Sequence, residues 1–336
     1  MRAHRSFDIF NGDADGLIAR HQFRLSHPAD SEPPTFVSGV KRDIALLDRV
    51  IATNDVLGGD RIQVFDISYD RNADAVQTLL NAGARITYFD HHRATRLQEH
   101  SGLDAHIDQS PQVCTSLLVD KYCRGAHRLW AIAAAFGDNL AAIGQQLSLD
   151  LNLPAPRIDK LKRLGECLNY NAYGETIDDL HYSPVDLAAR LAPYSSPLDF
   201  IEHEDVISRL QAGYDQDLSS ALAVEAIHES RAVRIFLLPN QSWARRISGT
   251  FANHLVHASP TQAHAVLTLA GEGDGDGDQR IATASIRAPQ SMPRDAARVA
   301  ANFANGGGRE IAAGIESFPL AQLSQMIATL EDTYRQ

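Results

Sequence analysis

Short apolar segments alternate with longer amphipathic ones over the first third of the chain. Between residues 6 and about 110, segments rich in Phe, Ile, Val and Tyr are each followed by a segment whose apolar residues recur at helical spacing. The predicted strands are 6–10, 34–40, 61–68 and 85–90, and the predicted helices are 15–25, 43–52 and 74–84. This alternation is typical of an α/β fold with a doubly wound, mainly parallel sheet.

The pattern changes twice further along the chain. Residues 112–212 are mostly helical in pattern, and strand patterns then return at 233–239, 264–271 and 280–288, with helices at 242–259 and 319–334. We therefore predict an α/β domain at 1–185, a helical connector at 186–220 and a smaller α+β domain at 221–336. The segment GEGDGDGDQ (271–279) is predicted to be an exposed hairpin loop.

Composition restricts the class of protein. A length of 336 residues suits two domains. A hydrophobic fraction of 44% with 22% charged residues is typical of a soluble globular protein, and no apolar run approaches the roughly 20 residues that cross a bilayer. The N-terminal segment MRAHRSFDIF lacks the apolar core of a secretory signal, and three cysteines at no metal-like spacing fit a reducing compartment. We expect a cytoplasmic protein with no membrane partner.

Charge argues against one class of partner. The formal net charge is −11, from 31 Lys and Arg against 42 Asp and Glu, so attraction to an extended DNA duplex is disfavoured. A site dense in carboxylates would contribute to this charge, and bound divalent cations would neutralise it. A small anionic substrate therefore remains compatible with the composition.

Carboxylate and imidazole side chains follow three of the predicted strands. In doubly wound sheets, ligands bind at the edge where the carboxyl ends of the strands meet. The side chains expected at this edge are Asp13, Asp15, Asp66, Asp90, His91 and His92. Clustered carboxylates repel one another unless cations compensate, and Asp with His is a ligand set that manganese, iron and zinc accept. We therefore predict a metal site.

The corner NGDADG also has two simpler interpretations. Asp13 can cap a helix while Asp15 interacts with the helix dipole, or the corner can begin a calcium loop. The calcium loop is disfavoured because its twelfth position is Gln22 rather than Glu and because a strand precedes it. The recurrence of Asp and His at the same sheet edge favours metal binding over capping alone. Two cations at this edge would support hydrolysis of phosphate esters.

Several motifs resemble those of one superfamily. GDADG, FDIS, YFDHH and AAFGDN, in this order and spacing, resemble the four signature blocks of the DHH phosphoesterase superfamily. NFANGGGREIAAG (302–314) and ASIRA (284–288) resemble the Gly-rich motif and the arginine-bearing strand of the DHH-associated substrate domain. That domain occurs in RecJ-type nucleases, nanoRNA hydrolases and cyclic-dinucleotide phosphodiesterases. The resemblance covers nearly the whole chain.

The resemblance implies a centre with two divalent ions. Mn²⁺ is the leading candidate, with Mg²⁺, Co²⁺ and Fe²⁺ as alternatives. Asp13 would bind one ion and Asp15 the other, Asp66 would bridge them, and His91 and Asp138 would complete the second site.

Catalytic and substrate-binding roles follow from the same resemblance. His92 would face the substrate phosphate, and Asp90 would orient a histidine. The candidate substrate-binding residues are Thr115 and Ser116, through backbone N–H groups at a helix start, and Arg287, Gly306, Gly307, Gly308 and Arg309 in the smaller domain.

Two positions depart from the superfamily pattern. Asn11 lies near the place where many relatives have a histidine, and it is an additional candidate ligand. Because a neutral amide is a weaker ligand for a transition metal, the first site is expected to bind loosely or to be completed by water. Arg309 stands where relatives usually have histidine; it retains phosphate capture but cannot transfer a proton.

The leading hypothesis is a two-metal-dependent phosphodiesterase that hydrolyses short nucleotide substrates in a cleft between two domains. Short oligonucleotides, linear or cyclic dinucleotides and nucleotide bisphosphates are all compatible with the motifs. The alternatives are a pyrophosphatase or polyphosphatase and a weakly active nucleotide-binding protein. The oligomeric state stays open, with a homodimer among the options.

Overall fold

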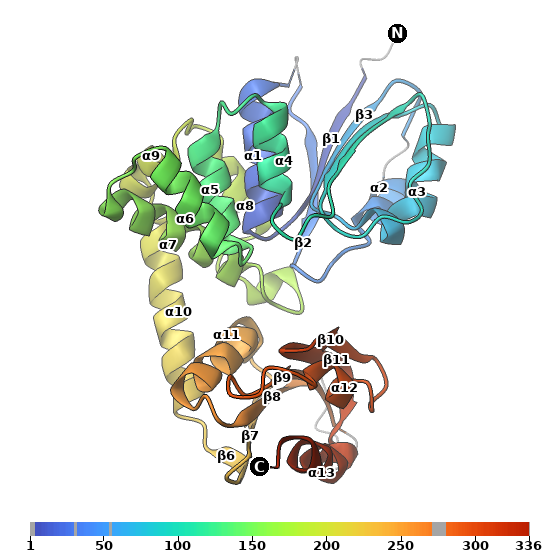
Figure 1. The fold of residues 1–336 in the computed structure, drawn as a ribbon. Coiled ribbons are helices and arrows are strands. Elements are labelled where there is room, and N and C mark those ends of the chain that lie inside the picture. Colours follow the sequence, from blue (N-terminus) through green and yellow to red (C-terminus); the bar gives the residue numbers. More distant parts are fainter. Residues whose placement is uncertain (1–3, 30–31, 54–55, 271–279, 336) are drawn as a thin grey trace. The chain divides into compact units, whose positions relative to one another are not determined.

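The computed structural model describes residues 4–29, 32–53, 56–270 and 280–335. The chain forms two compact units, residues 1–212 and 213–336, each with its own sheet and hydrophobic core (Figure 1). Among the helices within these described ranges, none is both long enough and apolar enough to cross a membrane.

Five parallel strands form the sheet of the first unit in the order β2-β1-β3-β4-β5. The strands are β1 (Ser6–Asn11), β2 (Thr35–Gly39), β3 (Arg61–Phe65), β4 (Arg85–Asp90) and β5 (Leu103–Ile107). The predicted α/β fold with a doubly wound parallel sheet is confirmed. Strand β5 was not predicted because it lies at the sheet edge, where its half-buried sequence LDAHI needs no continuous apolar run.

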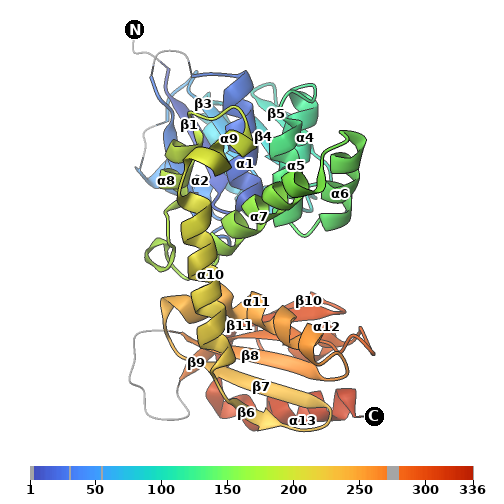
Figure 2. The same cartoon turned by 90° about the vertical axis from the view of Figure 1, so that its left-hand side faces the viewer.

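Helices cover both faces of this sheet (Figures 1 and 2). Helices α2 (Leu46–Thr53) and α3 (Tyr69–Asn81) cover one face. The other face carries a thicker helical layer, formed by α1 (Ala14–Ser26), α4 (Thr115–Tyr122), α5 (Arg128–Gly137), α6 (Ala141–Asp150), α7 (Ala155–Asn171), α8 (Pro184–Leu191), α9 (Pro197–His203) and the first part of α10 (Val206–Leu222). A short 3₁₀ helix, η1 (Ile177–Asp179), precedes α8.

Alternate residues of the inner strands pack against the helical layers on opposite faces of the sheet. Phe10 and Phe65 pack with the thicker layer, whereas their neighbours Ile9 and Val64 pack with α2 and α3. All four side chains are fully buried. This two-sided burial explains why the inner strands are recognisable as nearly continuous apolar runs.

Residues 186–212, which the sequence predicts as part of a connector, contribute to the interior of the first unit. Leu187 and Leu191 of α8, Phe200 of α9 and Leu210 of α10 are fully buried in the same cluster as α1 and α5. The last helices of this region, α9 and α10, are separated by a break at Glu204 and Asp205.

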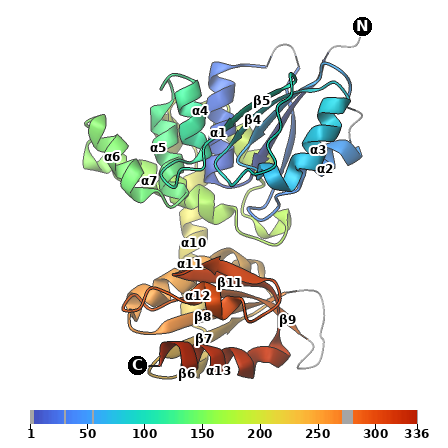
Figure 3. The same cartoon turned by 45° about the vertical axis from the view of Figure 1, so that its right-hand side comes forward.

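The second unit is built on a six-stranded mixed sheet in the order β10-β11-β9-β8-β7-β6 (Figure 3). Its elements are β6 (Ala226–Glu229), β7 (Val233–Leu238), α11 (Ser242–Ala258), β8 (Ala263–Ala270), β9 (Ile281–Arg287), α12 (Ala296–Ala300), β10 (Gly306–Arg309), β11 (Ala312–Pro319), η3 (Leu320–Gln322) and α13 (Leu323–Tyr334). Strands β7 and β8 are parallel, and the other neighbours are antiparallel. The predicted α+β fold of the smaller domain is confirmed, whereas the loop predicted at 271–279 lies outside the described residues.

Two helical layers also cover this second sheet. Phe251 of α11 packs edge-on against Phe236 of β7, with ring centroids 5.2 Å apart. Met326 and Leu330 of α13 belong instead to the cluster that contains Val233 of β7. The amphipathic helix predicted at the C-terminal end of the chain therefore closes the core of the second unit.

Candidate metal centre

Asp13 and Asp15 lie where β1 passes into α1, and both are buried. Asp13 is the N-cap of α1: its Oδ1 accepts the backbone N–H groups of Asp15 and Gly16, each at 3.1 Å. The tight corner depends on Gly16, because a Cβ there would lie 2.5 Å from the carbonyl oxygen of Asn11. Capping therefore engages Oδ1 of Asp13. Its other oxygen, Oδ2, contacts Lys41 instead.

Asp66 follows β3 directly and is buried in a left-handed backbone conformation with a φ of 59°. Few residues other than glycine adopt this conformation, although Asp and Asn tolerate it best. The Oδ1 atom of Asp66 accepts the hydroxyl of Thr115 at 3.0 Å and lies 3.4 Å from Nε2 of His91. Burial and the charges of Asp13 and Asp15 hold the pKa of Asp66 well above its usual range.

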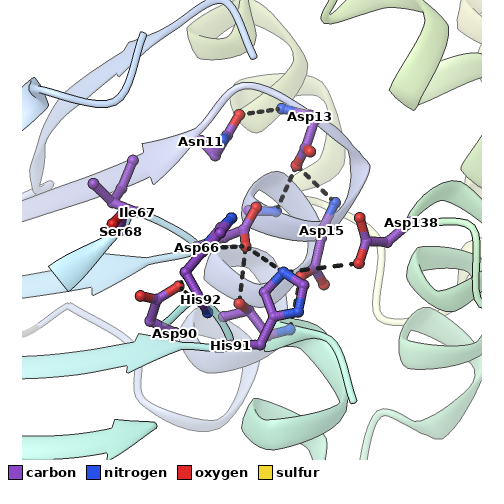
Figure 4. Close-up of polar contacts among 12 residues, drawn as sticks. Asn11, Asp13, Asp15, Asp66, Ile67, Ser68, Asp90, His91, His92 and Asp138 are labelled. Atoms are coloured by element: carbon purple, nitrogen blue, oxygen red, sulfur yellow. Dashed lines mark hydrogen bonds and ion pairs between the residues drawn. The ribbon is translucent and has the colours of Figure 1, made fainter. Parts of the chain in front are cut away.

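His91 follows β4 and is oriented by the backbone. Its Nδ1 donates to the carbonyl oxygen of Val113 at 3.0 Å, which leaves Nε2 directed at the carboxylates. Nε2 lies 3.4 Å from Oδ1 of Asp66 and 3.8 Å from Oδ2 of Asp138 (Figure 4). Burial acts to lower the pKa of His91, but the hydrogen bond with Asp66 and the charge of Asp15 outweigh it and raise the pKa to about 10.

His92 is paired with Asp90 at the end of β4. Its Nδ1 donates to Oδ1 of Asp90 at 2.6 Å, and the second oxygen of Asp90 accepts the backbone N–H of Tyr69 at 3.2 Å. Burial acts to lower the pKa of His92, yet the bond with Asp90 raises it above its ordinary value. Asp90 thus orients His92.

Asp138 caps the C-terminal end of α5 and reaches the same cluster. Its position depends on a close approach of α5 to its neighbours: a Cβ at Gly137 would lie 2.6 Å from the Cβ of Ala14. A Cβ at Gly165 in α7 would lie 1.9 Å from the carbonyl oxygen of Ala133. Burial, followed by the charges of Asp15 and Asp13, raises the pKa of Asp138 to about 7.

These side chains form a donor set that fits a divalent metal ion. Two groups of side chains, Asp66 with His91 and His92, and Asp15 with His91 and Asp138, have ligand atoms within 4.8 Å of one another. The raised pKa values of Asp66 and Asp138 show that the carboxylates repel one another where no cation compensates. Because oxygen and imidazole donors suit Mn²⁺ and similar ions, the residues present fit the predicted metal.

Lys41, which no sequence motif indicated, lies against Asp13. It follows β2, the neighbour of β1, at the same edge of the sheet. Its Nζ contacts Oδ2 of Asp13 and donates to Oδ1 of Asn169 at 2.9 Å. Burial opposes the charged form of both partners, but their mutual attraction dominates, so the pKa of Asp13 is lowered and that of Lys41 is raised. The sequence feature that could have indicated Lys41 is its position directly after a predicted strand.

Asn11, the additional candidate ligand, is committed to the backbone. Its Oδ1 accepts the N–H of Asp13 at 3.3 Å, and its Nδ2 donates to the carbonyl oxygen of Lys41 at 3.3 Å. The amide therefore braces the corner at the start of α1 and the segment that carries Lys41. The amide oxygen keeps a second lone pair, so the expectation that Asn11 offers its side chain to a metal stays a prediction.

Thr115 and Ser116 have a different role from the one predicted. Their backbone N–H groups, at the start of α4, donate to the two carboxylate oxygens of Asp15, each at 2.7 Å. Both side chains are fully buried. This corrects the expectation that these N–H groups bind substrate phosphate, since Asp15 already accepts them. The helix start instead fixes the carboxylate of Asp15.

The predicted substrate-binding residues of the smaller domain lie in the second unit. Gly306, Gly307, Gly308 and Arg309 form strand β10, which pairs with β11, so the expected Gly-rich loop is corrected to a strand. A Cβ at Gly306 would lie 1.9 Å from the carbonyl oxygen of Ala300, and one at Gly308, whose φ is 150°, would lie 2.5 Å from the Cα of Ala313. These two glycines are therefore required by packing, whereas Gly307 faces open space.

The two arginines in that unit differ in their surroundings. Arg287 ends β9 and donates from Nε to Oδ1 of Asn253 at 2.7 Å. Arg309 is exposed at the end of β10, the edge strand of the sheet. An exposed guanidinium on an edge strand retains its fork of donors for an anion.

No family model matches this chain, and no curated protein matches its sequence. Solved structures do match its fold. The DHH domain of a ribosomal-protein family member shares 14% identity with a TM-score of 0.61, over 98% of this chain and 86% of that one. The exonuclease RecJ bound to manganese shares 14% identity with a TM-score of 0.61, over 99% and 90%. The pGpG-specific phosphodiesterase PggH from Vibrio cholerae shares 10% identity with a TM-score of 0.52, over 98% of each chain.

The fold of this chain is that of the DHH-domain proteins. The resemblance predicted from the GDADG, FDIS, YFDHH and AAFGDN blocks is confirmed at the level of the fold. Two of the solved RecJ structures contain manganese, one of them from Thermus thermophilus. The donor set described above lies on the residues of these four blocks.

Proposed function

We propose that this protein is a metal-dependent phosphoesterase that hydrolyses phosphodiester bonds in short nucleotide substrates. The observation that carries the proposal is the convergence of Asp15, Asp66, His91 and Asp138 at one edge of the parallel sheet. The structural likeness to RecJ and to a pGpG-specific phosphodiesterase supports this class of reaction. Mn²⁺ is the proposed metal because RecJ binds it and because the donors suit it.

These four residues would hold the ion, which when bound would lower the pKa of a water molecule and withdraw charge from the phosphoryl oxygens. Thr115 and Ser116 fix the carboxylate of Asp15, and Val113 sets the ring of His91 so that Nε2 faces the ion. The chain's own residues thus pre-organise the donors before any substrate arrives.

His92 is the proposed group for substrate contact. Asp90 holds its Nδ1–H, which directs Nε2 outward from the β4 end. In hydrolysis, the oxygen of water forms a bond to phosphorus, the bond to the leaving oxygen breaks, and a proton passes to that oxygen. From Nε2, His92 would donate a hydrogen bond to the phosphoryl group or to the leaving oxygen.

Short nucleotide substrates are proposed for two reasons. A net charge of −11 disfavours a long electrostatic contact with nucleic acid. The arginines Arg287 and Arg309 of the second unit are proposed to bind phosphate, as forked donors suit this group. Within this class, oligonucleotides, linear and cyclic dinucleotides and nucleotide bisphosphates are the candidates.

A substrate panel with Mn²⁺ tests the proposal. We expect hydrolysis of a bis-nitrophenyl phosphate diester and of at least one nucleotide among di- to pentanucleotides of RNA and DNA, cyclic dinucleotides and a nucleotide bisphosphate. Chelation of the metal should abolish this hydrolysis. Release of phosphate from pyrophosphate alone would favour the pyrophosphatase alternative, and nucleotide binding without turnover would favour the binding protein.

A further inference from the structure

We propose that the ammonium group of Lys41 takes the place of one of the two divalent cations expected in this centre, so that the chain uses one metal ion together with one fixed lysine. The inference rests on the proposed function, because it specifies the set of cations in the same site. Three sets of contacts support it.

The first concerns Asp13, the ligand expected for the first ion. Its Oδ1 is engaged as the cap of α1, where it accepts the N–H groups of Asp15 and Gly16. Its Oδ2 contacts the ammonium of Lys41. This second oxygen, which would bind a metal, therefore already has a positive partner that belongs to the chain.

The second concerns Asn11, which the sequence offers as an additional ligand for the first ion besides Asp13 and the bridging Asp66. Both ends of its amide are hydrogen-bonded to the backbone, with the oxygen on the N–H of Asp13 and the nitrogen on the carbonyl oxygen of Lys41. Reversing the amide would place its oxygen against that carbonyl oxygen, so the orientation is fixed by its partners. Asn11 thus secures the segment that carries Lys41.

The third concerns the way Lys41 itself is held. Its Nζ donates to Oδ1 of Asn169 at 2.9 Å and lies 5.6 Å from the centre of the Tyr173 ring. Its backbone N–H donates to the carbonyl oxygen of Ala172 at 2.9 Å. Residues at the end of α7 and directly after it therefore hold the lysine in addition to Asp13, which is the arrangement expected of a permanent cation and not of a mobile surface lysine.

The remaining candidate ligands lie close enough together to hold one ion. Asp15, His91 and Asp138 have donor atoms within 4.8 Å of one another, and Nε2 of His91 lies 3.4 Å from Asp66. None of these residues contacts Lys41 by a hydrogen bond within the described part of the chain. Lys41 is therefore hydrogen-bonded to Asp13 and Asn169 and not to these ligands, although its charge also acts on Asp138.

A lysine can supply part of what a second ion supplies. Two of the three N–H donors of the ammonium are engaged, by Asp13 and Asn169, and the side chain of Lys41 is 24% exposed. The third donor is available for a phosphoryl oxygen, where a fixed positive charge stabilises developing negative charge. Activation of water is then left to the single metal ion.

Counting bound metal tests the proposal independently of activity. Metal-free full-length protein is dialysed against Mn²⁺, the bound ion is quantified by elemental analysis, and the electron paramagnetic resonance spectrum is recorded. We expect one ion per chain with the spectrum of an isolated Mn²⁺. Asp66→Asn should lose this ion, which shows that the count refers to the centre.

A double variant tests the role of the lysine. Asn11→His combined with Lys41→Met frees Asp13 and adds an imidazole, so we expect a second ion and the spectrum of an exchange-coupled pair. Lys160→Met, at an exposed position of α7, is the matched control and should keep one ion. Circular dichroism verifies that each variant is folded.

The outcomes are distinct. Two coupled ions in the wild-type protein would overturn the proposal, whether or not the double variant folds, and so would a folded double variant that still binds one ion. Absence of any bound ion in the wild type would overturn the metal centre as well. One ion without hydrolysis of any diester would contradict the proposed function while leaving the role of Lys41 intact.

Discussion

Asp66 combines an unfavourable backbone conformation with an unfavourable electrostatic environment. Its backbone is left-handed, its carboxylate is buried, and two further aspartates lie close enough to raise its pKa. Each of these features costs free energy of folding. A residue that combines them is characteristic of a functional site, where strain is retained because the chemistry requires the geometry.

His21 differs from the histidines of the centre because its described partners are an indole ring and a backbone carbonyl oxygen. It lies in α1, packs edge-on against Trp130, and donates from Nε2 to the carbonyl oxygen of Tyr194 at 2.9 Å. Burial is the main cause of its shift and lowers the pKa from 6.5 to about 4. The folded protein therefore keeps this imidazole neutral at a pH where the unfolded chain is protonated.

We predict that His21 makes the free energy of unfolding decrease as the pH is lowered. Its contribution is fully present above pH 6.5 and is lost as the pH falls toward about 4, because the unfolded chain binds the extra proton. The loss should reach the order of 3 kcal/mol, since one pKa unit corresponds to about 1.4 kcal/mol. His21→Gln retains an N–H donor but does not titrate. Urea unfolding should give curves for wild type and variant that converge on acidification; parallel curves would contradict the prediction.

Lys41 illustrates what residue-level inspection of a sequence misses. Asp-His-His and paired aspartates are patterns, whereas a single lysine after a strand resembles any surface lysine. Its role depends on Asn169 and Tyr173, which lie far away in the sequence and reach it only through the packing of α7. The same holds for Thr115, whose hydroxyl is matched to Asp66 by tertiary structure alone.

At the scale of elements, burial decided which strands could be predicted. Inner strands with apolar residues on both faces were identified, and their parallel order placed the acidic residues on one edge. Strands β5, β6, β10 and β11 were not predicted. Of the edge strands, β5 carries half-buried polar residues, β6 is only four residues long and β10 is largely glycine. The apolar residues of the inner strand β11 are interrupted by exposed Glu316 and Ser317. Glycine usually signals a turn, but Gly306 and Gly308 are needed here for close packing of a strand.

The contact between α5 and α7 gives a prediction at this scale. Gly165→Ala would place a Cβ 1.9 Å from the carbonyl oxygen of Ala133, so the two helices must separate and Asp138 must shift. We expect a loss of about 1–3 kcal/mol in the free energy of unfolding and weaker Mn²⁺ binding. Chemical denaturation and metal titration measure the two effects.

Gly249→Ala in α11 is the control for this change. The nearest atom to its Cβ would be 4.0 Å away, so only helix propensity should act and the variant should be slightly more stable. If Gly165→Ala behaved in the same way as this control, the close approach of α5 and α7 would not be what positions Asp138.

At the scale of the whole molecule, this chain is similar to solved structures in fold much more than in sequence. Identity with similar solved structures is only 8–15% among those with TM-scores of 0.50–0.61, yet they match over 98–99% of this chain. The short blocks around Asp13, Asp66, His91 and Asp138 carried the recognition because they lie at successive carboxyl ends of strands and at one helix end. Substrate identity could not be predicted, since these blocks carry the candidate metal ligands and not the groups that would contact the rest of a substrate.

The central claim is that the carboxylates at the strand ends bind a metal that hydrolyses phosphodiesters. Asp66→Asn tests it most directly, because asparagine tolerates the left-handed backbone and can still accept the hydroxyl of Thr115, but lacks the charge. The exposed Asp159→Asn in α7 is the control. Steady-state hydrolysis of the bis-nitrophenyl diester with Mn²⁺ is the measurement. We predict loss of at least about a hundredfold in kcat/KM for folded Asp66→Asn and no change for Asp159→Asn; near-normal turnover by folded Asp66→Asn would contradict the account.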